Sequence, residues 1–121
     1  MTPKQRLRAA EVIATQMAMN SLTIEALRNA GLSESREVQI DFLFVAPDEV
    51  KANALAAHLS ANDCLSVLVR RNGSFFSRKY LVEGKTYPTL VNERVLAEWL
   101  PWIVVQGAVL DCEFDGWGTE V

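Results

Sequence analysis

Residues 36–46 read REVQIDFLFVA, and their apolar side chains alternate along the chain. Successive side chains of a β-strand point to opposite faces, so this pattern predicts a strand with one buried face. That face carries Val38, Ile40, Phe42 and Phe44. The other face carries Asp41, Leu43 and Val45. We therefore expect the outer face of this strand to be only half polar.

The segments after this strand predict the order helix, strand, strand, helix, strand. A helix begins at Pro47 and runs to about residue 62, with Asp48 and Glu49 at its positive N-terminal end. Asn72–Gly73 then predicts a tight type I′ hairpin turn. Before this turn, Leu65, Val67 and Val69 are expected to face the core, and the return strand lies somewhere in 75–87.

The last two elements are a helix and a strand. The helix starts at Pro88–Thr89, and Pro101 is expected to kink or end it, which leaves the path of residues 100–108 open. Residues 109–115 read VLDCEFD and alternate as a strand, with Leu110, Cys112 and Phe114 inward.

Two helices are expected before residue 36. Leu7, Ala10, Ala14 and Met17 recur at helical spacing in residues 3–19. Asn20–Ser21 interrupts this pattern, and a second helix over about 22–30 would turn Leu22, Leu27 and Ala30 inward and be capped by Gly31. The prediction for residues 1–36 is therefore an N-terminal helical hairpin.

Together these elements predict an α+β fold, a ferredoxin-like βαββαβ sandwich over residues 37–121 that is preceded by the helical hairpin. The first and third strands would be central, and the second and fourth would be edges. Cys64 and Cys112 would then lie far apart as free thiols. Both helices would cover one face of the sheet, so the face with Leu43, Val45 and Leu68 needs another cover. The candidates are the N-terminal helices, a second copy in a homodimer, or a partner.

Composition narrows the class of function. The net charge is −3, with +2 in residues 1–36 and −5 in residues 37–121. The main domain therefore lacks the basic surface that nucleic-acid binding needs. No apolar run of 18 residues predicts a membrane span. We expect direct nucleic-acid binding and membrane insertion to be absent.

The ending FDGWGTEV, residues 114–121, holds the most specific candidate site. Gly116 and Gly118 allow a sharp turn that folds Trp117 back. Trp117 then seals the end of the core or anchors a protein interface, where tryptophan is a frequent hot spot. Nearby, Asp111, Glu113 and Asp115 either protect an edge strand or bind a basic partner.

Other residues give no catalytic set. His58 stands alone, without a second histidine or a suitably placed cysteine. Arg70, Arg71, Arg78 and Lys79 flank Phe75 and Phe76, a cluster more typical of a solvated hairpin tip than of an RNA-binding strand. We predict no catalytic residues, no cofactor and no metal.

DFLFVAPDEVKANALAAHL, residues 41–59, and the ending FDGWGTEV together resemble the regulator of ribonuclease activity B family. The shared features are an aromatic-rich strand, the helix start at Pro47, Asp48 and Glu49, and the terminal motif from Phe114 to Thr119. The likeness covers roughly residues 38–121 and is strongest at the two ends. It implies a ferredoxin-like fold, a cytoplasmic location and the inhibition of a ribonuclease E-type enzyme by binding it.

The predicted function is therefore non-catalytic regulation through a protein partner, with a ribonuclease as one expected partner. Trp117, Asp115, Glu113 and Asp111 are the predicted partner-binding residues. The alternative is a self-associating scaffold or immunity-type protein of the same fold, because the outer sheet face is half apolar.

Overall fold

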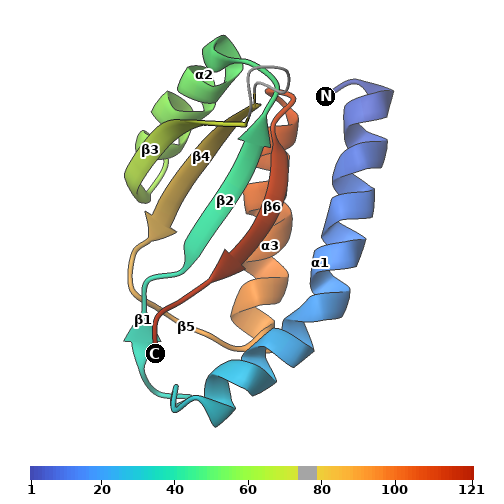
Figure 1. The fold of residues 1–121 in the computed structure, drawn as a ribbon. Coiled ribbons are helices and arrows are strands. Elements are labelled where there is room, and N and C mark those ends of the chain that lie inside the picture. Colours follow the sequence, from blue (N-terminus) through green and yellow to red (C-terminus); the bar gives the residue numbers. More distant parts are fainter. Residues whose placement is uncertain (74–78) are drawn as a thin grey trace.

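The computed structural model describes residues 1–73 and 79–121. In these residues the chain forms three helices and six strands in a mixed α/β arrangement (Figure 1). In chain order the elements are α1 Pro3–Asn29, β1 Glu37–Val38, β2 Asp41–Ala46, α2 Glu49–Ser60, β3 Cys64–Asn72, β4 Lys79–Thr86, β5 Thr89–Leu90, α3 Glu93–Ala108 and β6 Glu113–Gly118.

The main sheet has the strand order β3-β4-β2-β6, and every neighbouring pair is antiparallel. As predicted, β2 and β4 are central and β3 and β6 are edges. A second sheet, formed by β1 and β5, is short and was not expected. Helices α2 and α3 lie together against one face of the main sheet (Figure 1).

The stretch REVQIDFLFVA forms two strands rather than one. Its predicted inward side chains are all buried. After Val38, however, the chain leaves β5 and enters the main sheet between β4 and β6. At this crossing the backbone N–H of Ile40 donates to Thr86 Oγ1 at 2.9 Å, and the N–H of Thr86 donates to the carbonyl of Ile40 at 2.9 Å.

Aromatic side chains fill the core between the sheet and α3. Phe44 packs edge-to-face on Phe114 with ring centroids 5.4 Å apart, and Trp99 packs edge-to-face on Phe114 at 6.1 Å. Phe42 lies between Phe44 and Trp99. Such pairs stabilise beyond the area they bury, by about 1 kcal/mol each. The alternating apolar residues predicted from the sequence thus pack into one aromatic cluster.

Both edge strands contain a β-bulge that shifts which residues share a face. In β3, Leu65 and Leu68 oppose Lys85 and Glu83, so one extra residue lies on the β3 side. The bulge turns Leu65 with Leu68 away from the helices, which corrects the prediction that Leu65 faces the core. Val67 and Val69 pack against the core as expected.

The N-terminal helical hairpin was a wrong prediction, because α1 is a single helix of 27 residues. Asn20 and Ser21 do not break it, since tertiary contacts bind both side chains. The predicted inward residues Leu7, Ala10, Ala14, Met17 and Leu22 are exposed. The helix instead buries Ala9, Val12 and Asn20. Gly31 follows the end of the helix with φ of 108°, consistent with the predicted glycine cap.

The hairpin between β3 and β4 forms, but not with a two-residue turn at Asn72–Gly73. Asn72 is still within β3 and pairs with Lys79, so the connection is longer. Phe75, Phe76 and Arg78, which the sequence placed in the basic cluster, lie outside the described residues.

The helix predicted from Pro88 begins later, at Glu93. Residues 89–90 form β5 instead, and the Asn92 side chain caps α3 by accepting from the N–H of Val95 at 2.8 Å. Pro101 lies inside α3 without ending it, so residues 100–108 are helical. The strand predicted from residue 109 starts only at Glu113.

Helix α1 lies beside α3 and the edge strand β6, on the side of the sheet that the other helices cover (Figure 1). It therefore does not cover the opposite face, which we call the open sheet face and define by Leu43, Val45 and Leu68. Of the three covers considered from the sequence, the chain's own N-terminal segment is excluded. In the described residues, no helix has the length and apolar character needed to cross a membrane.

We predict that Gly107→Ala destabilises the fold, although alanine normally favours a helix interior by about 1 kcal/mol. A Cβ at Gly107 would lie 2.3 Å from Phe44 Cε1 and 2.8 Å from the Cys112 carbonyl oxygen. Such overpacking costs about 1–3 kcal/mol, which should lower the free energy of unfolding in urea. Gly118→Ala is the control, because its Cβ would meet nothing within 4 Å. An unchanged or raised stability of Gly107→Ala would contradict this packing.

Candidate protein-binding site

The four predicted partner-binding residues lie on β6 and the turn before it, but the structure gives them different surroundings. Asp111 and Glu113 contact basic side chains of the same chain. Asp115 is exposed at the β6 bulge, and Trp117 is half-buried.

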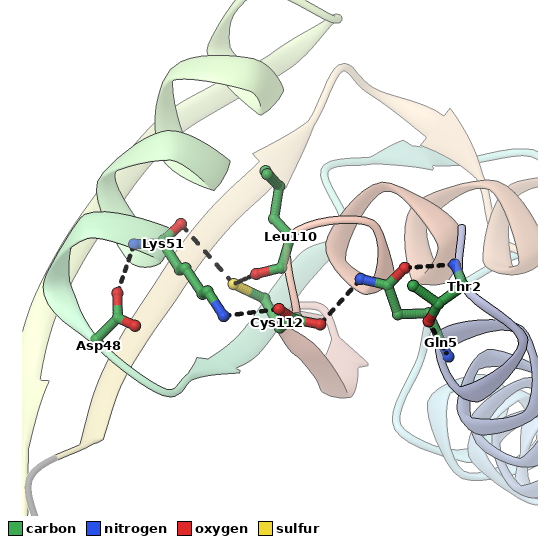
Figure 2. Close-up of polar contacts among 7 residues, drawn as sticks. Thr2, Gln5, Asp48, Lys51, Leu110 and Cys112 are labelled. Carbon is green, nitrogen blue, oxygen red and sulfur yellow. Dashed lines mark hydrogen bonds and ion pairs between the residues drawn. The ribbon is translucent and has the colours of Figure 1, made fainter.

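Asp111 joins three segments of the fold. It adopts a left-handed backbone conformation, with φ of 57°, in the turn after α3. Its carboxylate accepts a hydrogen bond from Lys51 Nζ of α2 at 2.6 Å and another from Gln5 Nε2 of α1 at 2.9 Å. Figure 2 shows Lys51 and Gln5 on opposite sides of the turn that holds Cys112.

These contacts shift the ionisation of both charged partners. The hydrogen bonds from Lys51 and Gln5 lower the pKa of Asp111 below its ordinary value of 3.8. The hydrogen bond to Asp111 raises the pKa of Lys51 above 10.5. Glu113 forms a similar ion pair with Arg8 of α1, which also pairs with Glu11. Both carboxylates therefore already have a basic partner in their own chain, so they are less available to a second protein.

Trp117 connects the core to α1. Its indole N–H donates to Asn20 Oδ1 at 3.0 Å, and its ring contacts both core clusters. Gly116 has φ of 154°, a conformation in which a side chain would be strained. The predicted sharp turn at the two glycines is wrong, because Gly116, Trp117 and Gly118 all belong to β6 and pair with β2. A bulge in β6, rather than a turn, directs the Trp117 ring onto the core. Sequence reasoning missed Asn20, although it shares a helical face with Val12 and Leu27 and a buried amide needs a partner.

Asp115 and Trp117 also border a shallow hollow of about 550 Å³ on the open sheet face. Leu43 and Leu68 form its apolar part, and the Leu68 side chain is 62% exposed. Ion pairs surround it, namely Asp41–Lys85 and Arg70–Glu83. An exposed leucine among paired charges is an arrangement that suits protein recognition, with an apolar centre and a polar rim.

The remaining candidates do not gather around this hollow. His58 Nε2 lies 2.6 Å from Gln106 Oε1, between α2 and α3. Cys64 and Cys112 are buried free thiols at opposite edges of the sheet, as predicted, and burial raises the pKa of each to about 11. In the described part of the chain, no three histidine, cysteine or acidic side chains are grouped so that they could hold a metal ion.

Comparison with known proteins gives no identification. No protein-family model matches the chain, and no curated protein matches it. The assignment of function therefore depends on the residues and geometry described above.

We predict that Asp111→Asn lowers stability at pH 7 and that this loss disappears at low pH. The pKa of Asp111 is depressed in the folded state, so its stabilisation is present above the unfolded pKa and is lost as the pH falls through the folded pKa. The raised pKa of Lys51 sets the opposite limit, because its contribution is lost as the pH rises above about 10.5. The measurement is the free energy of urea unfolding of the wild type and of Asp111→Asn, taken at several values from about pH 2 to about pH 9.

The matched control for this pH series is Asp115→Asn, since Asp115 forms no ion pair with any residue that the structure describes. Its stability should change little across the same range. A destabilisation by Asp111→Asn that does not shrink as the pH falls from about 7 to about 2 would contradict an ionic origin.

We predict that the Asn20–Trp117 hydrogen bond couples α1 to β6. In a double-mutant cycle of Asn20→Ala and Trp117→Phe, the two costs in unfolding free energy should overlap by about 1 kcal/mol. The coupling energy from this cycle does not contain the better helix propensity of alanine or the smaller ring of phenylalanine, because each of these effects occurs equally in the single and the double variant. Strictly additive costs in urea unfolding would show that this hydrogen bond does not stabilise the fold.

Proposed function

We propose that this chain is a non-catalytic regulatory domain that acts by binding another protein, and that a ribonuclease E-type endoribonuclease is the partner. We further propose that its βαββαβ core is of ferredoxin-like type. The strand order β3-β4-β2-β6 with both crossover helices on one face supports this fold.

The resemblance to the regulators of ribonuclease activity B supports the choice of partner. Its two matching segments fall on neighbouring elements, because residues 41–59 form β2 and α2, and residues 114–118 belong to β6, which pairs with β2. The proposal places the chain in the cytoplasm, where a reducing environment would keep Cys64 and Cys112 as thiols.

The open sheet face is the observation that carries the proposal. Its hollow combines the exposed Leu68 with Asp115 from the terminal motif. Burying an exposed leucine side chain contributes about 2 kcal/mol, so Leu68 can act as the central contact. Asp115 would pair with a basic group of the partner, since the neighbouring acids Asp111 and Glu113 are already paired in the chain.

The alternative function is a self-associating scaffold or immunity-type protein. The same half-apolar face favours it, because a second copy could cover Leu68 as well as a different protein could. The two functions can be told apart by what binds the open sheet face. The regulatory function requires a different protein there, and the scaffold function requires a second copy of the chain.

The test measures binding of the purified full chain to a purified ribonuclease E-type endoribonuclease, together with the rate of RNA cleavage. We expect the chain to bind the enzyme and slow cleavage, and Leu68→Asp to weaken both effects about tenfold or more because it places a charge in the apolar contact. Val50→Asp is the matched control, since Val50 is 79% exposed on α2, which covers the opposite face.

Circular dichroism and urea unfolding establish that both variants fold. If the wild-type chain does not bind the ribonuclease, the choice of partner is wrong. If Leu68→Asp and Val50→Asp weaken binding equally, the open sheet face is not the binding surface. If Leu68→Asp instead changes only the oligomeric mass of the chain, the scaffold alternative is correct.

A further inference from the structure

The outward side of α1 carries four exposed apolar side chains among polar ones. Leu7, Ala14, Ala18 and Leu22 fall within an arc of about 80° around the helix axis at 3.6 residues per turn. Leu7 is 64% exposed and Leu22 is 70% exposed, and both alanines are exposed. This side is opposite the one that buries Ala9 and packs on α3. Two exposed leucines on this side, 15 residues apart, give the helix two separate apolar contact points.

We propose that two copies of this chain associate through this outer side of α1, with the two helices antiparallel. In this arrangement Leu7 of one copy lies beside Leu22 of the other, and two-fold symmetry repeats the contact at the opposite end. The alanines lie between the two leucine contacts. Their short side chains allow the helix axes to approach closely, because interaxial distance depends on the residues at the contact.

Charges on α1 favour the antiparallel register. Lys4 lies three residues before Leu7, and Glu25 lies three residues after Leu22. The register that joins the leucines therefore also brings Lys4 of one copy beside Glu25 of the other, again twice. Neither side chain forms an ion pair within 4.0 Å among the residues that the structure describes. Lys4 does border the groove that holds Asp111, and its charge contributes to the lowered pKa of that carboxylate. A parallel pair of helices would instead place Lys4 beside Lys4 and Glu25 beside Glu25, which is unfavourable.

One further charge lies on this side of the helix without opposing the contact. Glu11 is neutralised within its own chain by Arg8. The contact spans the 16 residues from Leu7 to Leu22, about 22 Å of helix. An interface of this length is at the small end of specific contacts, so the dimer should be reversible. Because α1 does not cover the open sheet face, this interface is separate from the proposed partner-binding surface (Figure 1).

The test is sedimentation velocity of the full chain from about 10 µM to 1 mM, the range in which a small interface dissociates. We expect the mass to rise with concentration from 13.5 kDa toward twice that value. Leu22→Glu should remain at 13.5 kDa throughout, whereas the exposed-site control Val50→Glu should dimerise like the wild type. Circular dichroism must first establish that both variants are folded.

Exchange of the two charges tests the register. Lys4→Glu and Glu25→Lys should each weaken the dimer, and the double variant Lys4→Glu/Glu25→Lys should restore it. A wild-type chain that stays at 13.5 kDa would overturn the proposal, as would a dimer abolished by Leu68→Asp but not by Leu22→Glu. A double exchange no better than the single ones would overturn the antiparallel register.

Discussion

The bulge within β6, at Asp115, is the constraint on which the rest of the structure depends. Phe114 and Trp117 are three residues apart and would point to opposite faces of a regular strand. The extra residue at the bulge pairs Phe114 with Phe44 and Trp117 with Phe42, so both aromatic rings lie on the helix-covered face. Phe114 then completes the aromatic core, and Trp117 reaches Asn20 of α1. One local irregularity thus connects the sheet, α3 and the N-terminal helix.

The attachment of α1 changes the meaning of the acidic C-terminal region. Viewed as sequence, its carboxylates form a patch for a basic partner. In the fold, Glu113 binds Arg8 of α1, while Asp111 binds Gln5 of α1 and Lys51 of α2. These exposed pairs are individually weak. Together with the Trp117 contact they hold α1 beside β6. The basic N-terminal segment thus pairs with acidic residues of its own chain rather than of another protein. We therefore place the proposed partner contact on the open sheet face, where Leu68 and Asp115 border the same hollow.

The position of α1 also leaves two apolar surfaces rather than one. The helix packs beside α3 instead of across the sheet, so it leaves the open sheet face uncovered and adds its own outer side with Leu7 and Leu22. The two surfaces lie on different elements. The two proposed contacts would therefore not compete with each other.

Local sequence alone determined the order of the main elements and the central position of β2 and β4. Alternation over residues 38–44, the helix start predicted at Pro47 and the short connections leave few alternatives for the sheet. For Trp117 the sequence predicted a sharp turn at the flanking glycines, whereas the chain stays in β6 and a bulge directs the ring onto the core. The sequence did not determine that α1 is one helix, because Asn20 and Ser21 favour a break unless distant partners bind them. Trp117 and Glu93 supply those partners only after folding. The sequence also did not determine the two bulges or the formation of β5 where the first turn of α3 was expected. It did not determine which apolar residues of α1 are buried. Each of these depends on contacts between segments far apart in the chain, and only the tertiary structure brings such segments together.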